Sequence, residues 1–459
     1  MAICTPLYGK GGTTISVAGL ATFLNFPVFR LFTHLVFSGS RDILKKNTLT
    51  WNTLKMRLLQ ALGFAVLAGN AAADVVKDLE DEGRPALDAV IAQSETCSED
   101  KLEVRREWGD ITPEERRAWI DAVLCLLETP SKLDPATYPG AKNRYDDFVV
   151  VHMNQTMSIH GTGNFLVWHR YYTWLWERAL KEECGYTGTQ PYWNYGKWYE
   201  DPLASPIFDG SDTSLGGNGA PISAAEKRAI KSANKKRQGD VPPGGGVWPG
   251  MPPGGGGGGF GGGFPGGGFG FGGGDGGGCI ETGPFVNMTV TLGPMAAVVQ
   301  PAPAANPQPD GYGSNPRCIR RDITNTLGMN YGKPEDIYNS IVNYPDIVSF
   351  QNFMQGGSGV HGVGHFTVAG DPGGDFYISP NEPSFWLHHA MIDRIWTIWQ
   401  SLDYEERRMA MEGGTSMMGG GRAQSLDDPV EMNVVGETYL IRDLMSTVDG
   451  PGPFCYVYE

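Results

Sequence analysis

Seven of the eight histidines in this chain fall in two short windows of the sequence. The first window holds three of them and the second holds four: His152, His160 and His169, then His361, His365, His388 and His389. A single buried histidine usually satisfies a local hydrogen bond and nothing more, but seven in two clusters indicate metal binding. Neutral imidazole is the commonest metal ligand in proteins.

The second window has the spacing of a helical metal site. His361 and His365 are four residues apart, so on a helix they share one face and can converge on one ion. His388 and His389 follow on the next helical segment, and we expect His389 to supply the third imidazole. This window therefore predicts a site with three imidazole ligands.

The first window predicts a second site of the same kind, although its three histidines are too far apart in sequence to share one helix turn and must come from separate elements. Neither window includes a cysteine ligand or the glutamate of an HExxH motif, which argues against a zinc protease. A zinc hydrase needs a single trio, whereas imidazole-only sites suit copper. The presence of two such trios therefore predicts two copper ions, with open positions where dioxygen can bind between them.

Helices must position these ligands. Residues 111–129 have Thr112 as N-cap, Pro113 at the first helical position and Glu115 at the capping-box position, which together predict a helix. Apolar periodicity predicts four further helices, at residues 75–95, 145–158, 169–183 and 384–401. Convincing alternating strands are few. The predicted fold class is therefore mainly α, with long loops and little β structure.

Composition narrows the class of protein and its partners. The 459 residues are 41% hydrophobic and include 12 tryptophans and 18 tyrosines, which suits one large enzyme domain. A formal net charge of -15 repels phosphate backbones and anionic lipids. We expect a small-molecule substrate, no nucleic-acid partner and no stable membrane association.

The start of the chain reads as a targeting region. Residues 56–73 contain an arginine, an apolar run and three alanines that suit a cleavage site, which predicts a secretory signal peptide. We expect residues 1–55 to be an upstream extension of the gene model and residues 74–459 to form one secreted, extracellular domain. A membrane anchor at 18–38 is the alternative, but three residues make it a poor span: Pro27, Arg30 and His34.

Six cysteines follow this targeting region, an even number that predicts up to three disulfides in an oxidising compartment: Cys97, Cys125, Cys184, Cys279, Cys318 and Cys455. Their connectivity stays open at this point. Asn154 and Asn287 each begin an Asn-Xaa-Thr acceptor, so we expect a glycoprotein. Burial near the histidines argues against modification of Asn154.

Residues 243–278 are almost wholly glycine with scattered proline and phenylalanine. Such a segment has too few side chains to build a core, so we predict a disordered insertion. The insertion costs little stability, because loop-closure entropy grows only logarithmically with length. The alternative is a self-associating tract of glycine and phenylalanine in a secreted structural protein.

Two longer stretches, "FLVWHRYYTWLWERAL" and "SPNEPSFWLHHAMIDRIW", resemble the two copper-binding signatures of tyrosinases and catechol oxidases (polyphenol oxidases), the type 3 copper proteins. Three further stretches are similar to short secreted fungal members, so the resemblance spans most of residues 95–458: "WGDITPEERRAWIDAVLCL", "SPIFDGSDTSLGG" and "NPRCIRRD". It implies a four-helix bundle core that directs six imidazoles at a di-copper centre.

The resemblance also implies a reaction. Members oxidise phenols or o-diphenols to o-quinones and reduce dioxygen to water, without an organic cofactor. A haemocyanin-like protein that binds oxygen without turnover is the alternative. The predicted signal peptide, the short chain and the residues of the two signatures favour the enzyme.

Position by position, the resemblance implies His152, His160 and His169 as copper A ligands and His361, His365 and His389 as copper B ligands. The family uses the second histidine of the adjacent pair, which makes His388 a neighbouring group. Asp393, one helical turn after His389, matches the acidic position of the signature and is expected to orient this region through hydrogen bonds. A simple helix salt bridge is the alternative for Asp393.

Aromatic residues complete the expected site. Phe376 matches the gate phenylalanine that shields copper B in plant catechol oxidases, although an ordinary packed side chain is equally expected there. Phe165 opens the first signature and is a further candidate to contact substrate. Ser158 stands where some fungal members carry a cysteine joined to the second copper A histidine, so that thioether cannot form.

The expected substrate preference rests on a missing acid. Members that hydroxylate monophenols well often have an asparagine after the first copper B histidine and an upstream glutamate, which hold a water as base. Here Gly362 follows His361, and residues 347–360 contain no acid. Three amides are left to hold that water: Gln351, Asn352 and Gln355. Amides are weak bases, so we expect oxidation of o-diphenols or o-methoxyphenols and only weak hydroxylation of monophenols.

The last expectation concerns activation. Tyr456 and Tyr458 in "CYVYE" match the tyrosine motif that closes the core in relatives. We expect no lid domain and no activation by its removal.

Overall fold

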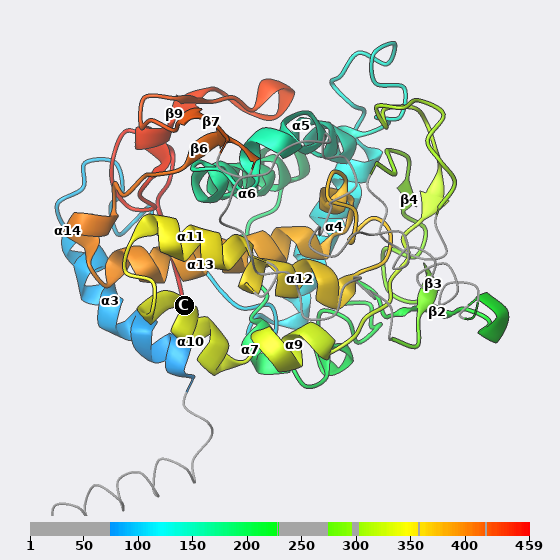
Figure 1. Ribbon diagram of the computed structural model, residues 1–459, viewed down its shortest axis with the longest axis horizontal. Helices are drawn as coiled ribbons and strands as arrows, with labels where there is room; N and C mark the ends of the chain where they lie inside the picture. Colours follow the sequence, from blue (N-terminus) through cyan, green and yellow to red (C-terminus); the bar gives the residue numbers. More distant parts are fainter. Residues whose placement is uncertain (1–73, 227, 229–273, 296–302, 357–358, 418–419) are drawn as a thin grey trace, which may run out of the picture. The chain divides into compact units, whose positions relative to one another are not determined.

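Four helices form the centre of the protein. They are α5 (Arg144–Ile159), α6 (Phe165–Cys184), α12 (Val360–Val368) and α13 (Ser384–Ser401). In Figure 1, α13 crosses the middle of the molecule, with α5 and α6 above it and α12 below it. Helix α6 packs against both α5 and α13, and α13 packs against α12. This arrangement confirms the predicted mainly α fold with a bundle at its core.

The structure is a computed structural model that describes residues 74–226, 228, 274–295, 303–356, 359–417 and 420–459. The predicted signal peptide, the upstream extension and the alternative membrane anchor all lie outside the described residues. Among the residues that are described, no helix combines the length and the apolar character needed to cross a membrane.

The remaining helices pack around the central four. The longer ones are α3 (Val75–Ile91), α4 (Pro113–Glu128), α10 (Pro334–Val342) and α11 (Ile347–Gln355). Helix α3 contacts α10 and α13, while α4 contacts α5 and α6. Short helical turns complete the set: α7 (Tyr195–Trp198), η2 (Pro202–Ala204), α9 (Thr326–Tyr331), η3 (Ser379–Asn381), α14 (Tyr404–Arg407), η5 (Asn433–Val435) and η6 (Ile441–Leu444).

Strands in the described part of the chain are short and occur in pairs. Strand β1 (Glu103–Arg105) pairs in parallel with β10 (Tyr456–Tyr458), which brings the last residues of the chain beside residues near the start of the fold. The other pairs are antiparallel: β2 (Gly219–Pro221) with β3 (Gly277–Ile280), β4 (Thr289–Val290) with β5 (Arg317–Cys318), β6 (Gly414–Ser416) with β7 (Gly420–Ala423), and β8 (Pro429–Val430) with β9 (Tyr439–Leu440). The expectation of little β structure is confirmed.

Local sequence explains where the helices begin and end. Both hydrogen bonds of the predicted capping box are present at the start of α4, between Thr112 and Glu115. Helix α5 begins with a second capping box, formed by Asn143 and Asp146. Helix α6 ends at Gly185, whose φ of 69° is left-handed and suits glycine at a helix C-terminus. Two predicted helices have the wrong length: α3 stops at Ile91 and not at residue 95, and α6 begins at Phe165, four residues before the predicted start at 169.

The core centres on α13, of which every residue is buried. Its charged side chains are paired inside the fold, Asp393 with Arg170 and Arg394 with Glu80, so α13 has no solvent face. Trp386 of α13 stacks on Trp176 of α6 with ring centroids 3.8 Å apart. Helix α13 is therefore fixed on the helix that carries His169.

The six cysteines form three disulfides, as predicted, and the structure supplies the connectivity. The pairs are Cys97–Cys455, Cys125–Cys184 and Cys279–Cys318. The second pair joins α4 to the end of α6. The first joins two residues that are 358 positions apart in the chain.

The predicted boundary of the glycine-rich insertion is wrong at its C-terminal end. Residues 274–278 are described, and Gly277 already belongs to β3. Three features order this end: the pairing of β3 with β2, a hydrogen bond from Gly277 N to the Arg321 carbonyl oxygen, and the disulfide of Cys279. Residues 243–273 lie outside the described part of the chain.

Candidate metal centre

The first histidine trio comes from α5, its C-cap and the start of α6, so the prediction of separate elements is wrong for the two histidines of α5 and its cap. His152 lies in α5, His160 caps its C-terminus and His169 lies in α6. Their ring centroids are 5.0–5.9 Å apart. The three side chains are buried, and each offers a ring nitrogen within 4.8 Å of the others. The structure thus brings the predicted copper A residues together.

Backbone carbonyls fix the orientation of these three rings. Nδ1 of His160 lies 2.9 Å from the Thr156 carbonyl oxygen, and Nδ1 of His169 lies 2.8 Å from that of Phe165. Nδ1 of His152 lies 2.9 Å from the carbonyl oxygen of Tyr377, which belongs to a distant loop. These contacts leave Nε2 of each ring for a metal ion, which is how proteins usually present histidine ligands.

The second histidine group comes from α12 and α13. His361 and His365 lie on one face of α12, as their spacing predicted, and their Nε2 atoms are 3.1 Å apart. His388 and His389 approach from α13, and the four residues offer ring nitrogens that all lie within 4.8 Å of one another. Distance alone therefore does not choose between His388 and His389 as the third ligand.

Contacts do distinguish the two adjacent histidines. The hydroxyl of Tyr195 lies 2.8 Å from Nδ1 of His388. Gly364 faces the same ring, and a Cβ at that position would lie 2.0 Å from Nδ1, so this glycine leaves the room that the ring needs. In His388 only Nε2 is buried without a hydrogen-bond partner among the described residues, whereas in His389 both ring nitrogens are. Tyr195 and Gly364 were not predicted: Tyr195 lies outside both histidine windows, and Gly364 lies between His361 and His365.

The two groups face each other directly. His169 and His389 stack with ring centroids 4.4 Å apart, and His160 and His361 are 6.1 Å apart. Phe165 lies between the groups, with its ring 4.7 Å from His169 and 4.9 Å from His361. The structure therefore combines both groups and Phe165 in one centre.

Burial keeps these imidazoles uncharged at neutral pH. It lowers the pKa of His160 to about 4, and burial together with the neighbouring His160 lowers the pKa of His365 to about 3. Burial is also the largest cause that lowers the pKa of four more rings well below the ordinary range: His152, His169, His361 and His389. Neutral rings with unpartnered, buried Nε2 atoms on His152, His169 and His389 fit metal ions that take only imidazole ligands.

Asp393 links α13 to α6, the helices that carry His389 and His169. Its Oδ1 accepts a hydrogen bond from Nε of Arg170, the residue after His169. Its Oδ2 accepts hydrogen bonds from the hydroxyls of Tyr456 and Tyr458, at 2.6 and 2.7 Å. Asp393 is 3% exposed, so these are buried, charge-assisted bonds rather than a surface salt bridge.

The other predicted residues lie around the centre. The ring of Phe376 is 4.6 Å from that of His160, and Gly362 is buried in α12. Gln351 is buried in α11; its Nε2 donates to the Glu412 carbonyl oxygen at 2.6 Å, and its Oε1 has no partner among the described residues. The prediction missed Phe385, whose ring is 4.2 Å from that of His389. Phe385 lies inside the signature "SPNEPSFWLHHAMIDRIW", and this position could have identified it as part of the centre.

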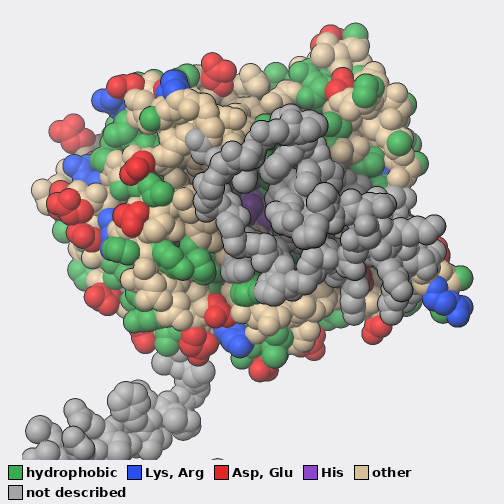
Figure 2. Space-filling view, viewed as in Figure 1, with side chains coloured by type: hydrophobic (Ala, Val, Ile, Leu, Met, Phe, Trp, Pro, Cys, Tyr) green, Lys and Arg blue, Asp and Glu red, His purple; other side chains and the backbone are tan. Residues whose placement is uncertain are grey.

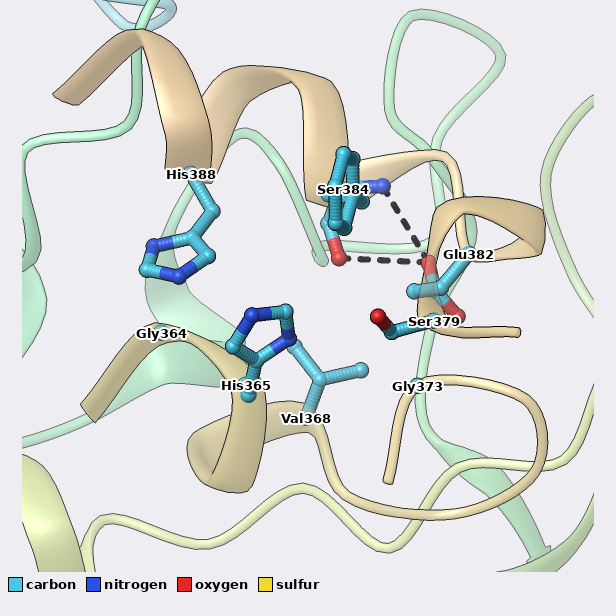
Figure 3. A pocket seen from close by; sticks show the side chains of 9 residues that line it. Gly364, His365, Val368, Gly373, Ser379, Glu382, Ser384 and His388 are labelled. Atoms are coloured by element: carbon cyan, nitrogen blue, oxygen red, sulfur yellow. Dashed lines mark hydrogen bonds between the residues drawn. The ribbon is translucent and has the colours of Figure 1, made fainter. Parts of the chain in front are cut away.

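Access to the centre comes from the side of α12. His361 and His365 are partly exposed, and Figure 2 shows histidine atoms visible on this face of the molecule. A separate small pocket lies between α12 and α13, lined by His365, His388 and Glu382 (Figure 3). It has room for about one water molecule and is too small for an aromatic ring.

Comparison with known proteins agrees with this centre. Residues 142–402 match the family model described as the common central domain of tyrosinase. Tyrosinase P of Aspergillus terreus is 36% identical over 368 residues, which cover 78% of this chain and 92% of that protein. N-acetyl-6-hydroxytryptophan oxidase ivoB of Emericella nidulans is 35% identical over 394 residues, or 82% of this chain and 97% of that protein.

A solved structure is also similar to this protein in fold and in sequence. A polyphenol oxidase variant from Thermothelomyces thermophila superposes with a TM-score of 0.71 at 34% identity, covering 84% of this chain and 98% of that one. The family match spans more than half of the chain and includes both histidine groups. The chain therefore belongs to the tyrosinase family, the type 3 copper oxidoreductases, which bind two copper ions and oxidise phenols with dioxygen.

Proposed function

We propose that this protein is a secreted oxidase that converts o-diphenols to o-quinones while dioxygen is reduced to water. It would also convert o-methoxyphenols to o-quinones, with the methoxy group released as methanol. The observation that carries the proposal is the pair of uncharged histidine groups that face each other beside Phe165. When bound there, the two copper ions would supply the binding and reduction of dioxygen.

The proposed ligands are His152, His160 and His169 for copper A and His361, His365 and His389 for copper B. The choice of His389 is supported by its two unpartnered ring nitrogens and by its stacking on His169. His388 is held at Nδ1 by Tyr195 and would orient its surroundings. Asp393 would hold α6 and α13, and thereby His169 and His389, at a fixed separation.

Aromatic side chains would exclude water from the reacting centre. Phe165 contacts both histidine groups, and Phe385 packs on His389. Phe376 covers His160 at the edge of the centre. A phenolic ring approaching from the side of α12 would thus enter an aromatic, apolar surrounding that suits a neutral substrate better than an ionic one.

Monophenols are proposed to be poor substrates. An ordinary phenol has a pKa near 10 and stays protonated at neutral pH, so its hydroxylation needs a base. Gln351 is buried and has only a free amide oxygen to hold a water, and Gly362 has no side chain to orient one. An amide-held water accepts a proton less readily than one beside a carboxylate.

Oxygen uptake tests the proposal most directly. Monophenols, o-diphenols and o-methoxyphenols should be compared in an oxygen electrode, with a hydroxylated indole added because one relative is named for such a substrate. Rapid, catalytic uptake with catechols is expected. Stoichiometric, reversible oxygen binding without quinone formation would favour the haemocyanin-like alternative instead.

The substrate preference has its own test. Gly362→Asn is expected to raise the ratio of monophenol to diphenol turnover, because the new amide can orient a water beside His361. The matched control is Gly185→Asn at the end of α6, where an added Cβ would meet no atom within 4 Å, and it should leave the ratio unchanged. Wild-type hydroxylation of tyrosine as fast as catechol oxidation would contradict the proposed preference.

Secretion is supported by the three disulfides and by the predicted signal peptide at residues 56–73. The described fold begins at Asp74, whose side chain caps α3. Mass spectrometry of the protein from the culture medium should therefore find an N-terminus at or near Asp74. Retention of residues 56–73 in the extracellular protein would contradict the proposed cleavage.

A further inference from the structure

One copper A histidine depends on a distant part of the chain for its orientation. His160 and His169 direct Nδ1 to carbonyls four residues earlier in their own segments. Nδ1 of His152 instead lies 2.9 Å from the carbonyl oxygen of Tyr377, 225 residues further along the chain. The ring of His152 can therefore be no better ordered than the loop that carries Tyr377.

A buried carboxylate fixes that loop. Oδ1 of Asp375 accepts a hydrogen bond from Tyr377 N at 2.9 Å, and Oδ2 accepts one from Met295 N at 2.8 Å. Asp375 is fully buried. Its two oxygens thus tie the loop to the segment around Met295 and set the position of the Tyr377 backbone.

The same short segment touches a second ligand. Phe376, between Asp375 and Tyr377, places its ring 4.6 Å from that of His160. A shift of this segment would therefore disturb two of the three imidazoles proposed for copper A. Among the described residues, this segment shares no hydrogen bond or ring contact with the histidines of α12 and α13, so copper B would be less affected.

We propose that Asp375 is a positioning residue for copper A, acting through the Tyr377 carbonyl on His152. The inference rests on the proposed role of His152 as a ligand. Asp375 itself contacts neither a proposed ligand nor the substrate. It determines where a carbonyl oxygen stands, and that oxygen determines which way Nε2 of His152 points.

The chemistry of the carboxylate makes the inference testable. Asparagine has the shape of aspartate but replaces one acceptor oxygen with an NH₂ donor. In Asp375→Asn, one of the two backbone N–H groups would face that donor and lose its partner. An unsatisfied buried donor is costly enough to displace the loop.

Asp371 provides a matched control on the same loop. It is also buried, and its carboxylate binds Arg317 through two bonds of 2.7 and 3.0 Å. No hydrogen bond to a histidine is found for Asp371 among the described residues. Asp371→Asn should therefore destabilise the fold without a specific effect on copper A.

The experiment measures copper retained per chain while the purified holoprotein is equilibrated with increasing chelator. Asp375→Asn is expected to lose one copper at a chelator concentration about 10- to 100-fold lower than the wild type, the usual effect of removing support from a metal ligand. Asp371→Asn should follow the wild-type curve even if its unfolding midpoint falls. Tyr377→Phe keeps the carbonyl and should also follow the wild type.

Three outcomes would overturn the role of Asp375, and a fourth would refute the ligand assignment on which that role rests. An unchanged chelator curve for Asp375→Asn, or an equal shift for Asp371→Asn, overturns the inference. If Asp375→Asn does not fold, Asp375→Glu keeps both oxygens but displaces them, and the absence of any shift in that variant likewise overturns it. Retention of two copper ions by His152→Ala would instead refute the ligand assignment in the proposed function, whatever the Asp375 variants do.

Discussion

At the scale of single residues, hydrogen-bond partners define the roles of the histidines. Rings that turn Nδ1 toward a carbonyl, as His152, His160 and His169 do, present Nε2 to the centre. His388 differs because the hydroxyl of Tyr195 meets its Nδ1. The neighbouring ring of His389 is supported by packing, since it stacks on His169.

Copper analysis can separate the two adjacent histidines. We expect His389→Ala to lose at least one of the two copper ions and all oxidase activity, because it removes a ligand. His388→Ala should keep both ions at saturating copper and bind copper B about 10- to 100-fold more weakly. Elemental analysis and chelator titration measure both. A copper-depleted His388→Ala beside an active His389→Ala would show that the ligand choice is reversed.

A second residue-scale prediction concerns Asp146, which is buried at the start of α5. Burial raises the pKa of this carboxyl from 3.8 to about 7, although Oδ2 accepts hydrogen bonds from Lys142 N and Asn143 N. A raised folded-state pKa means that folding favours the protonated form. The free energy of unfolding contributed by Asp146 is therefore fully present below pH 4 and falls as the pH rises toward 7.

Asp146→Asn should remove this dependence, because the amide stays neutral and its oxygen can accept both backbone bonds. The variant is expected to gain stability over the wild type as the pH rises from 4 to 8, by at most about 4 kcal/mol. Urea unfolding at several pH values measures the difference. A difference between the two proteins that does not change with pH would contradict the raised pKa.

At the scale of elements, one carboxylate holds α6, α13 and β10 together. Asp393 of α13 binds Arg170 of α6 and both tyrosines of β10. Since Arg170 follows His169 and Asp393 lies one turn after His389, this network sets the separation of two proposed ligands, one for each copper ion. The bundle therefore positions the centre through a buried polar contact as well as through apolar packing.

Breaking this network should affect both stability and metal binding. Asp393→Asn leaves the buried guanidinium of Arg170 without its counter-ion and is expected to cost about 3–5 kcal/mol of unfolding free energy. Copper affinity should fall as well. Asp121→Asn in α4 is the control, because its salt bridge to Arg117 is on the surface and contributes less than about 1 kcal/mol. Equal losses in the two variants would contradict the proposed role.

At the scale of the whole molecule, the two ends of the fold are joined twice. Strand β10 pairs with β1, and Cys455, just before β10, is linked to Cys97. These contacts bring the tyrosines of β10 to Asp393 in the core. The end of the described chain is therefore part of the structure that supports the metal centre.

The disulfides should differ in their contribution according to the length of chain that they close. Cys97–Cys455 spans 358 residues and Cys279–Cys318 spans 39. Replacing the first pair with alanines should lower the unfolding free energy by about 2 kcal/mol more than replacing the second, if the entropy of the unfolded chain dominates. Urea unfolding without reductant provides the comparison. A larger loss for Cys279–Cys318 would show that native-state contacts dominate instead.

The sequence by itself determined the features that depend on neighbours in the chain. The spacing of His361 and His365 predicted their shared helix face, and the capping box of Thr112 and Glu115 predicted the start of α4. Repeated clustering of one residue type predicted the two metal groups. Such patterns are readable because helix periodicity and capping involve residues within one or two turns.

The tertiary structure decided the features that join distant segments. The pairing of six cysteines, the contact of Tyr195 with His388, and the contact of His152 with the Tyr377 carbonyl all cross about 40 to 360 positions. The ordered end of the glycine-rich segment belongs here too, since β2 and a disulfide order residues whose composition predicted disorder. No local pattern encodes these contacts, because they exist only once packing of the helices has chosen which surfaces meet.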